Sequence, residues 1–323
     1  MRVILAAPRG FCAGVDRAID IVEMALEVYG PPIYVRHEII HNEHVVGRLR
    51  DKGAIFTDFL TDVPSGSHLI FSAHGVSPAV RREAADRHLK VIDATCPLVT
   101  KIHLEVHKYL KRGYGIFYIG HRGHVETEGT LGEAPDRLIL ITTEEEVATL
   151  PEPTEEKLIY LTQTTLSIDE TQGIVDALKR RFPRLETPPT DDICYATQNR
   201  QDAVKVLARR ADTILVVGSH TSSNSRSLRQ VAAAYGARAF LIDDRHSLTD
   251  EMLTDAETVG VTAGASAPED VVQGVLTALQ ERGATEIEEF VLLKEDMEFR
   301  VPPGLVELYR GKRSDSSVAP SVP

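Results

Sequence analysis

The three cysteines of this 323-residue chain are widely spaced, and each lies near the start of a predicted helix. Cys12 and Cys96 are 84 residues apart (96 − 12), and Cys194 follows 98 residues later (194 − 96). A thiolate near a helix N-terminus is favoured by the helix dipole and is ready to bind a metal. Thiolates select zinc or iron–sulfur clusters, and zinc sites usually contain a Cys-x-x-Cys pair, which is missing here. Three separated cysteines therefore favour a [4Fe–4S] cluster with one open iron, although buried cysteines are also commonly inert.

Polar side chains follow almost every predicted strand. Open α/β sheets bind ligands in the loops at the carboxyl ends of their strands, and unpaired N–H groups at helix starts hold anions. Because the chain has no P-loop and no Gly-x-Gly-x-x-Gly motif, these loops predict a phosphate or diphosphate site made of His, Ser, Thr and Asn. For any single Ser, Thr or Asn, the alternative is a helix N-cap. The residues concerned include His41, His74, His124, Thr164, Ser222, Ser223, Asn224 and Ser266.

Glu126 is the carboxylate that stands out. It lies two residues after His124 in a glycine-containing loop, where a carboxyl group could deliver a proton to a leaving hydroxyl. The alternative is that Glu126 only supplies negative charge to the first turn of a helix. The residues alone leave both interpretations open.

Short apolar strands alternate with amphipathic helices almost throughout, which predicts an α/β fold with parallel sheets. The order strand, cysteine, helix occurs three times and predicts three small α/β domains, each contributing one cysteine. Pro183–Pro189 is interpreted as a linker, and Arg310–Pro323 as a flexible tail. The expected strands are 3–7, 33–35, 68–72, 90–93, 115–119, 138–141, 158–161, 213–217, 239–242 and 259–262. The expected helices are 13–29, 44–52, 78–88, 97–113, 144–150, 168–182, 196–210, 225–236 and 268–282.

Composition narrows the class of protein further. The net charge of −12 and the low aromatic content of 6% argue against binding to nucleic acid, which needs a basic face and stacking side chains. No apolar run is long enough to span a bilayer, and the opening residues do not form a secretory signal. An odd number of cysteines without such a signal argues against a disulfide framework. We therefore expect a cytoplasmic protein.

Nine motifs, in order along the chain, identify a family resemblance. The chain resembles the 4-hydroxy-3-methylbut-2-enyl diphosphate reductases, the LytB/IspH family, over roughly residues 1–270. One departure is Val125, where many members have proline, which would loosen the loop that carries Glu126. The matching stretches are Pro8–Ala18, Val35–Asn42, Phe71–Pro78, Asp93–Val99, Gly120–Glu126, Thr162–Ser167, Asp191–Thr197, Ser222–Ser225 and Thr262–Glu269.

The resemblance implies a pseudo-threefold trefoil of three α/β domains around one [4Fe–4S] cluster. Cys12, Cys96 and Cys194 would hold the cluster and leave one iron open. The domains would span 14–96, 97–193, and 1–13 with 194–285, followed by a C-terminal segment and tail at 286–323. Glu126 would supply protons, and Thr164 would contact the hydroxyl end of the substrate. The diphosphate would be bound by His41, His74, His124, Ser222, Ser223, Asn224 and Ser266.

The implied reaction is the reductive dehydroxylation of (E)-4-hydroxy-3-methylbut-2-enyl diphosphate to isopentenyl and dimethylallyl diphosphate. It is the final step of the non-mevalonate isoprenoid pathway, with reduced ferredoxin or flavodoxin as the expected electron donor. Two alternatives remain open. A hydro-lyase with the same cluster would turn over without a reductant, and a metal-cluster or zinc sensor would not need the Ser-Ser-Asn and Thr-Thr loops.

Overall fold

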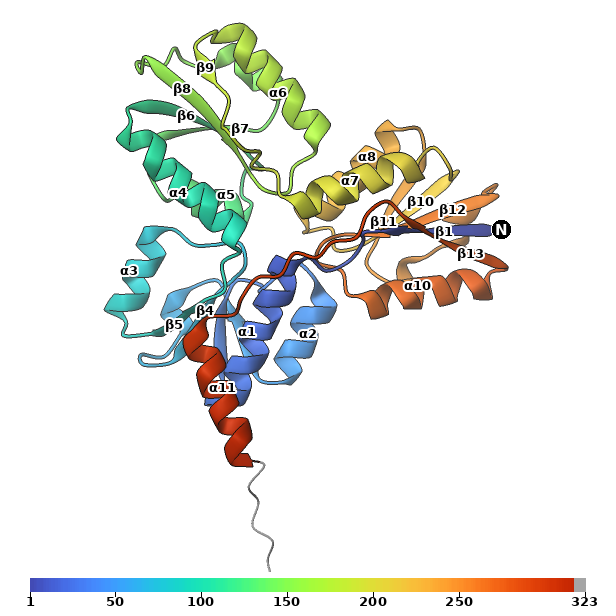
Figure 1. Ribbon diagram of the computed structural model, residues 1–323, viewed down its shortest axis with the longest axis horizontal. Helices are drawn as coiled ribbons and strands as arrows, with labels where there is room; N and C mark the ends of the chain where they lie inside the picture. The colour runs from blue at the N-terminus through green and yellow to red at the C-terminus, as the bar shows by residue number, and fades with distance from the viewer. Residues whose placement is uncertain (317–323) are drawn as a thin grey trace, which may run out of the picture. The chain divides into compact units, whose positions relative to one another are not determined.

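The computed structural model describes residues 1–316, which form two compact units (Figure 1). The first unit comprises Met1–Cys12 and Leu98–Asp296, and the second comprises Ala13–Pro97 and the described residues from Met297 to Ser316. Within residues 1–316, three sheets make up the fold, two in the first unit and one in the second, and all of their strand pairs are parallel. The predicted fold class, α/β with three mainly parallel sheets, is confirmed.

The largest sheet has five strands in the order β11-β10-β12-β1-β13 and belongs to the first unit. Alternate residues of β1 face opposite sides, as the two-residue period of a strand requires. Val3 and Leu5 pack with α10, whereas Ile4 and Ala6 pack with α7 and α8, so helices cover both faces (Figure 1). Its elements are β1 (Arg2–Ala7), β10 (Thr213–Val217), β11 (Arg238–Ile242), β12 (Thr258–Ala263), β13 (Glu286–Val291), α7 (Tyr195–Leu207), α8 (Ser223–Ala234), α9 (Asp250–Leu253) and α10 (Glu269–Glu281).

The second sheet of the first unit has four strands in the order β7-β6-β8-β9. Phe117 and Ile119 of β6 pack with α6 on one face, and Ile116 and Tyr118 pack with α4 on the other. Its elements are α4 (Pro97–Lys111), β6 (Tyr114–Ile119), α5 (Val125–Leu131), β7 (Leu138–Ile141), β8 (Lys157–Thr162), α6 (Ile168–Arg181) and β9 (Leu185–Glu186).

The sheet of the second unit has the order β3-β2-β4-β5. Helix α11 packs on α1 of the same unit: Leu305 is buried, and Lys312 Nζ donates to Val28 O at 3.2 Å. The elements are α1 (Ala13–Tyr29), β2 (Ile33–Arg36), α2 (Glu43–Asp51), β3 (Ala54–Thr57), β4 (His68–Phe71), α3 (Pro78–Asp86), β5 (Lys90–Asp93) and α11 (Pro303–Ser316).

Most predicted elements are present, and three predictions need correction. The expected linker at 183–189 contains the short edge strand β9, and the expected helix at 144–150 is a 3-10 helix over Glu145–Thr149. The expected tail is wrong for residues 310–316, which continue α11; residues 317–323 lie outside the described part of the chain. Strands β3 and β13 were not predicted. Three of the six residues of β13 are glutamate, which hides the strand, whereas β3 was missed although three of its four residues (AIFT) are apolar.

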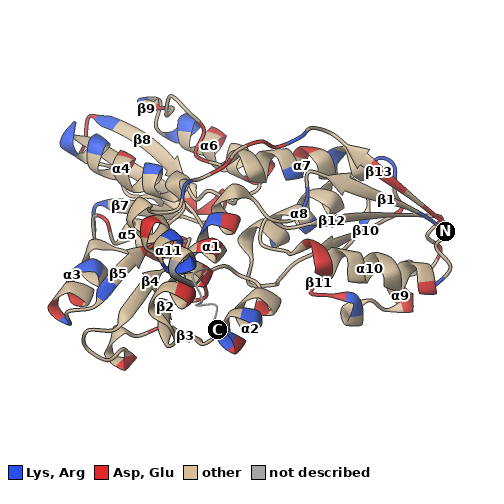
Figure 2. Ribbon diagram, turned by 60° about the horizontal axis from the view of Figure 1, so that its bottom comes forward, with Lys and Arg blue, Asp and Glu red and all other residues tan. Residues whose placement is uncertain are grey.

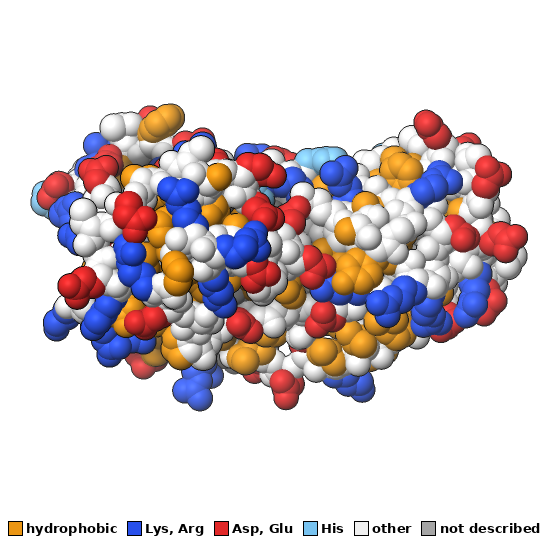
Figure 3. All heavy atoms as spheres, turned by 90° about the horizontal axis from the view of Figure 1, so that it is seen from above, with side chains coloured by type: hydrophobic (Ala, Val, Ile, Leu, Met, Phe, Trp, Pro, Cys, Tyr) orange, Lys and Arg blue, Asp and Glu red, His pale blue; other side chains and the backbone are white. Residues whose placement is uncertain are grey.

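The three-domain division at residues 96, 193 and 285 stays a prediction. Acidic and basic residues alternate along the helices of the ribbon in Figure 2, and the space-filling face in Figure 3 shows side chains of both charges intermingled. Within residues 1–316, we find no helix with the length and apolar character needed to cross a membrane.

Candidate active site

Glu126 and Thr164 form a buried pair in the first unit. Glu126 lies in the first turn of α5 and is 3% exposed, and Thr164, which follows β8, is 5% exposed. The backbone N–H of Thr164 donates to Glu126 Oε1 at 2.8 Å, and its hydroxyl donates to Oε2 at 3.0 Å. The carbonyl of Thr164 in turn accepts the N–H of Cys194 at 2.9 Å. The Glu126 carboxylate and the Thr164 hydroxyl are thereby held together, and the backbone of the segment that carries Cys194 is bonded to the same threonine.

Cys12 and Cys194 belong to the same unit and interact electrostatically. Within residues 1–316 the three cysteines form no disulfide, and each lies directly before a helix: Cys12 precedes α1, Cys96 precedes α4, and Cys194 is the N-cap of α7. The pKa of Cys194 is raised to about 11, first because burial disfavours the thiolate and second because of the negative charge of Cys12. Without a cation nearby, two thiolates in this position are unfavourable.

A network of side-chain contacts connects these two cysteines. The Cys194 sulfur lies 3.2 Å from the hydroxyl of Thr197, which accepts from Asn224 Nδ2 at 3.3 Å. Asn224 Oδ1 accepts the N–H of Ala265 at 2.9 Å, and the carbonyl of Ala265 accepts the N–H of Cys12 at 3.3 Å. The amide of Asn224 therefore has partners at both ends within the protein.

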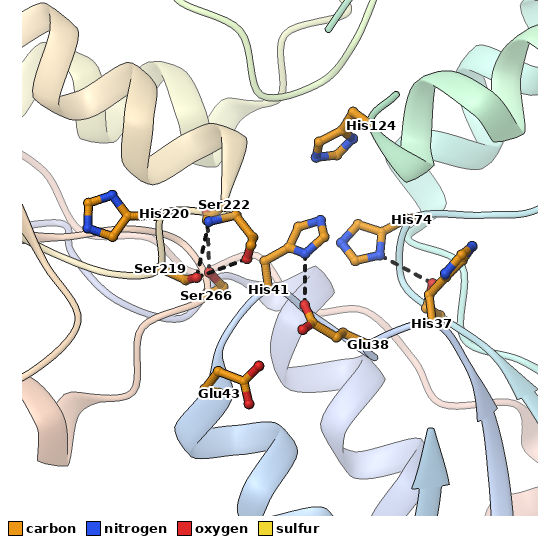
Figure 4. A network of polar contacts seen from close by, with 12 residues as sticks. His37, Glu38, His41, Glu43, His74, His124, Ser219, His220, Ser222 and Ser266 are labelled. Atoms are coloured by element: carbon orange, nitrogen blue, oxygen red, sulfur yellow. Dashed lines mark hydrogen bonds and ion pairs between the residues drawn. The ribbon is translucent and has the colours of Figure 1, made fainter. Parts of the chain in front are cut away.

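Of the serines around α8, Ser222 fulfils the helix-cap alternative that the sequence left open. Ser222 is the N-cap of α8 and accepts the N–H of Ser225 at 3.3 Å, while the hydroxyl of Ser266 donates to Ser222 Oγ at 3.5 Å (Figure 4). Ser223 donates to the carbonyl of Thr165 at 3.3 Å. Capping does not use the remaining N–H groups of the first turn, which together with the helix dipole favour an anion.

His124 caps α5 in a similar way. Its Nδ1 accepts the N–H of Glu126 at 3.2 Å. This contact requires Nδ1 to carry no proton, so the neutral imidazole is protonated at Nε2 and presents a donor there.

His41 and His74 lie together in the second unit. Their ring centroids are 4.2 Å apart, with an angle of 32° between the rings. Glu38 Oε2 lies 3.0 Å from His41 Nδ1 (Figure 4), and Ser72 Oγ lies 3.2 Å from His74 Nδ1. The Glu38 carboxylate favours a proton on Nδ1 of His41, and this contact fixes the orientation of the ring. Nε2 is then the ring nitrogen that does not face Glu38.

The predicted site residues thus fall into two groups. The second unit holds His41, His74 and Cys96, and the first unit holds the remaining ones. Among residues 1–316, no three His, Cys, Asp or Glu side chains are placed to hold a metal ion. The assignment of all three cysteines to one cluster stays a prediction.

Two further residues contact the site and were not singled out from the sequence. Thr197 contacts the sulfur of Cys194, and its position three residues into the same helix was the available signal. His121 Nδ1 lies 3.2 Å from Ser223 Oγ, and its pKa is lowered because the ring is buried and Arg226 lies nearby. Nothing in the sequence links His121 to a serine about a hundred positions later.

Comparison with known proteins supplies the family. The family model described as "LytB protein" matches residues 3–280. The chain belongs to the LytB family. A relative from Haemophilus influenzae (strain PittGG) is 53% identical over 308 residues, covering 94% of this chain and 98% of the relative. A relative from Corynebacterium diphtheriae is 55% identical over 306 residues, with coverages of 94% and 92%. Both relatives carry the name 4-hydroxy-3-methylbut-2-enyl diphosphate reductase.

A solved structure agrees with the assignment of this chain to the LytB family. The structure of the E-1-hydroxy-2-methyl-but-2-enyl-4-diphosphate reductase from Plasmodium falciparum is similar to this chain with a TM-score of 0.93 and 39% identity. The match covers 97% of this chain and 99% of that one. The family resemblance seen in nine short motifs is therefore confirmed over nearly the whole chain.

Proposed function

We propose that this chain is an oxidoreductase that converts (E)-4-hydroxy-3-methylbut-2-enyl diphosphate into isopentenyl and dimethylallyl diphosphate. The observation that carries this proposal is identity of 53% and 55%, over 94% of the chain, to relatives named for one diphosphate reductase. The reaction breaks the allylic C–O bond, consumes two electrons and two protons, and releases water.

The residues present fit a [4Fe–4S] cluster. Cys12, Cys96 and Cys194 would hold it, since thiolates are the usual ligands of such clusters. The raised pKa of Cys194 means that this thiol ionises more readily beside a positive partner, and iron supplies that charge. When bound, the cluster supplies electrons and Lewis-acid chemistry at its open iron.

Glu126 is the proposed proton donor. Its carboxyl group is buried and held at both oxygens by Thr164, so its position relative to the substrate hydroxyl is fixed before binding. The hydroxyl of Thr164 lies on the carboxyl and is the proposed contact to the substrate oxygen. A proton held at Glu126 would leave with that oxygen as water, and a second proton would complete the product at carbon.

The diphosphate would be bound by two sets of groups. The first unit offers His124, Ser222, Ser223, Asn224 and Ser266, four of them at or beside the N-terminus of α8. The second unit offers His41 and His74, whose rings are held by Glu38 and Ser72. Imidazole and hydroxyl donors together with a helix N-terminus suit a ligand that carries several negative charges. Fixing the diphosphate end orients the hydroxyl end for reaction.

The reaction also needs an external electron donor, for which we propose reduced ferredoxin or flavodoxin. The decisive experiment is anaerobic turnover after reconstitution with iron and sulfide, with dithionite-reduced viologen as the electron source. We expect both diphosphate products, with one water released for every two electrons consumed. Turnover without any reductant would instead identify a hydro-lyase. Bound zinc without sulfide would overturn the cluster, and Mössbauer spectra with and without substrate would report on the open iron.

A further inference from the structure

The largest fully buried side chain within residues 1–316 is an arginine. Arg200 of α7 has no exposed surface. Its Nε and Nη2 donate to the carbonyl of Gly10 at 3.1 and 2.7 Å, and Nη2 also donates to the carbonyl of Phe11 at 3.1 Å. Nη1 donates to the Glu295 carboxylate at 3.0 and 3.1 Å. These two carbonyls belong to the residues directly before Cys12. Arg200 lies six positions after Cys194, so a side chain that follows Cys194 holds the loop that precedes Cys12.

Arg17 makes the same kind of contact in the second unit. It lies on α1, five positions after Cys12. Its Nη1 donates to the carbonyls of Ala94 and Thr95 at 3.1 and 3.0 Å, and its Nη2 donates to the carbonyl of Asp93 at 3.4 Å. These three carbonyls directly precede Cys96.

Lys101 completes the pattern. It lies on α4, five positions after Cys96, and its Nζ donates to the carbonyl of Asp191 and to Asp192 Oδ1, both at 3.0 Å. The Asp192 side chain is 1% exposed, and its other oxygen accepts the N–H of Thr162 at 3.0 Å. Asp191 and Asp192 lie just before Cys194.

Each cysteine loop is thus held by a cation from the helix that follows another cysteine. The cation after Cys12 holds the loop before Cys96, the one after Cys96 holds the loop before Cys194, and the one after Cys194 holds the loop before Cys12. We propose that these cations are positioning residues that fix the backbone of each cysteine for the cluster. This inference rests on the cluster of the proposed function. The three positioning residues are Arg17, Lys101 and Arg200.

A second set of contacts acts on the same three loops. The N–H groups of Cys12, Cys96 and Cys194 each donate to one carbonyl, of Ala265, Ala73 and Thr164 respectively, at 3.3, 2.9 and 2.9 Å. These bonds hold the N–H of each cysteine, and the cations hold carbonyls that precede it, so the two sets of contacts together fix the backbone on both sides of the peptide. Groups that orient metal ligands in this way commonly change metal affinity by about 10- to 100-fold.

The C-terminal segment takes part in two of the three contacts. Glu295 pairs with Arg200 in the first unit, and the carbonyl of Arg300 accepts from Arg17 Nε at 2.8 Å in the second. These positions lie five residues apart on the segment that follows β13. The segment thereby helps to hold both arginines in place.

The test begins with hydrogen exchange on the metal-free chain, which does not depend on a cluster. Arg17→Met, Lys101→Met and Arg200→Met should each raise exchange about tenfold in the loop that the cation holds and leave the other two cysteine loops unchanged. The second measurement is release of iron to a chelator from the reconstituted protein, which should be about 10- to 100-fold faster in the variants. If Arg200→Met does not fold, Arg200→Lys keeps the charge but not the planar fork and should give a smaller change in the same loop.

Matched controls have the same chemistry away from the cysteines. Arg87 donates to the carbonyls of Thr61 and Val63 at 3.2 and 3.0 Å, and Lys205 pairs with Asp169 at 3.1 Å. Arg87→Met and Lys205→Met should leave iron release at the wild-type rate. The inference would be overturned if a variant showed no change in hydrogen exchange in the loop that its cation holds. It would also be overturned if hydrogen exchange in that loop became faster while iron was released at the wild-type rate. Failure of the proposed function would be a different result: the wild-type protein would bind iron and sulfide but would not reduce the substrate.

Discussion

Replacing Glu126 by glutamine separates proton delivery from positioning. Glutamine keeps the size of the side chain, its Oε1 can still accept the Thr164 N–H now seen at 2.8 Å, and its amide can donate to the Thr164 hydroxyl now at 3.0 Å. The charge and the ionisable proton are lost while the contacts remain. Charged hydrogen bonds are worth about 1 kcal/mol more than neutral ones, so we expect only that order of loss in stability.

The loss in rate should be much larger. General acid catalysis contributes about 100- to 10,000-fold, which corresponds to about 2.7–5.4 kcal/mol of activation free energy. We therefore expect kcat of Glu126→Gln to fall by that factor, while KM and the iron and sulfide content stay near wild type. The assay is anaerobic steady-state turnover with a reduced viologen and quantification of both products.

Two further variants make the interpretation sharp. Glu128→Gln changes an exposed carboxylate on the same helix and should leave kcat unchanged. Glu126→Asp keeps a carboxyl group but shortens the side chain. It should therefore weaken the contacts of the carboxyl group with Thr164 while it keeps a proton to deliver. If Glu126→Gln turns over within about threefold of wild type, the reasoning that gives Glu126 a proton to deliver is refuted.

Three other outcomes follow from the site. Asn224→Ala removes the acceptor for the buried N–H of Ala265 and the donor to Thr197, so urea unfolding should show a loss of about 1–3 kcal/mol; Asn224→Asp, which keeps the acceptor, should lose less. Because the pKa of Cys194 is about 11 against an ordinary 9.0, the metal-free chain should carry about 100-fold less thiolate at that position near pH 8. Iodoacetamide labelling followed by peptide mass spectrometry should then show slow reaction in the folded chain and fast reaction in denaturant, and equal rates would contradict the shift. Removal of iron by a chelator should abolish turnover, and iron with sulfide, but not zinc, should restore it.

The pH dependence of the metal-free fold has a definite sign. Since the folded chain keeps the Cys194 proton up to about pH 11 and an unfolded thiol loses it near 9.0, the unfolded state binds fewer protons between these values. Stability of the metal-free chain should therefore fall as pH rises through this window. Thermal unfolding at pH 8 and pH 10, compared with a Cys194→Ala variant, measures the contribution.

Local sequence was enough to predict the elements that carry their own signal. The helix at 13–29 and the strands at 90–93, 138–141 and 213–217 have the predicted bounds, because the apolar pattern of each is local. Gly30 and Gly218 also mark where the helix and the last of these strands end. Strand β13 was missed since three of its six residues are glutamate, and it is a strand only through pairing with β1. The helix at 303–316 was expected to be part tail, because its packing on α1 is visible only in the fold.

The candidate site divides in the same way. The sequence by itself determined which residue types stand at strand ends and helix starts, and hence the thiols, the anion-binding groups and Glu126. Only the tertiary structure decided their partners: that Thr164, 38 residues away, holds both oxygens of Glu126, that Asn224 bonds inside the protein at both ends, and that three cations hold the cysteine loops. Capping and periodicity act over three or four residues, whereas a hydrogen bond between distant segments exists only after the sheets have paired and excluded water.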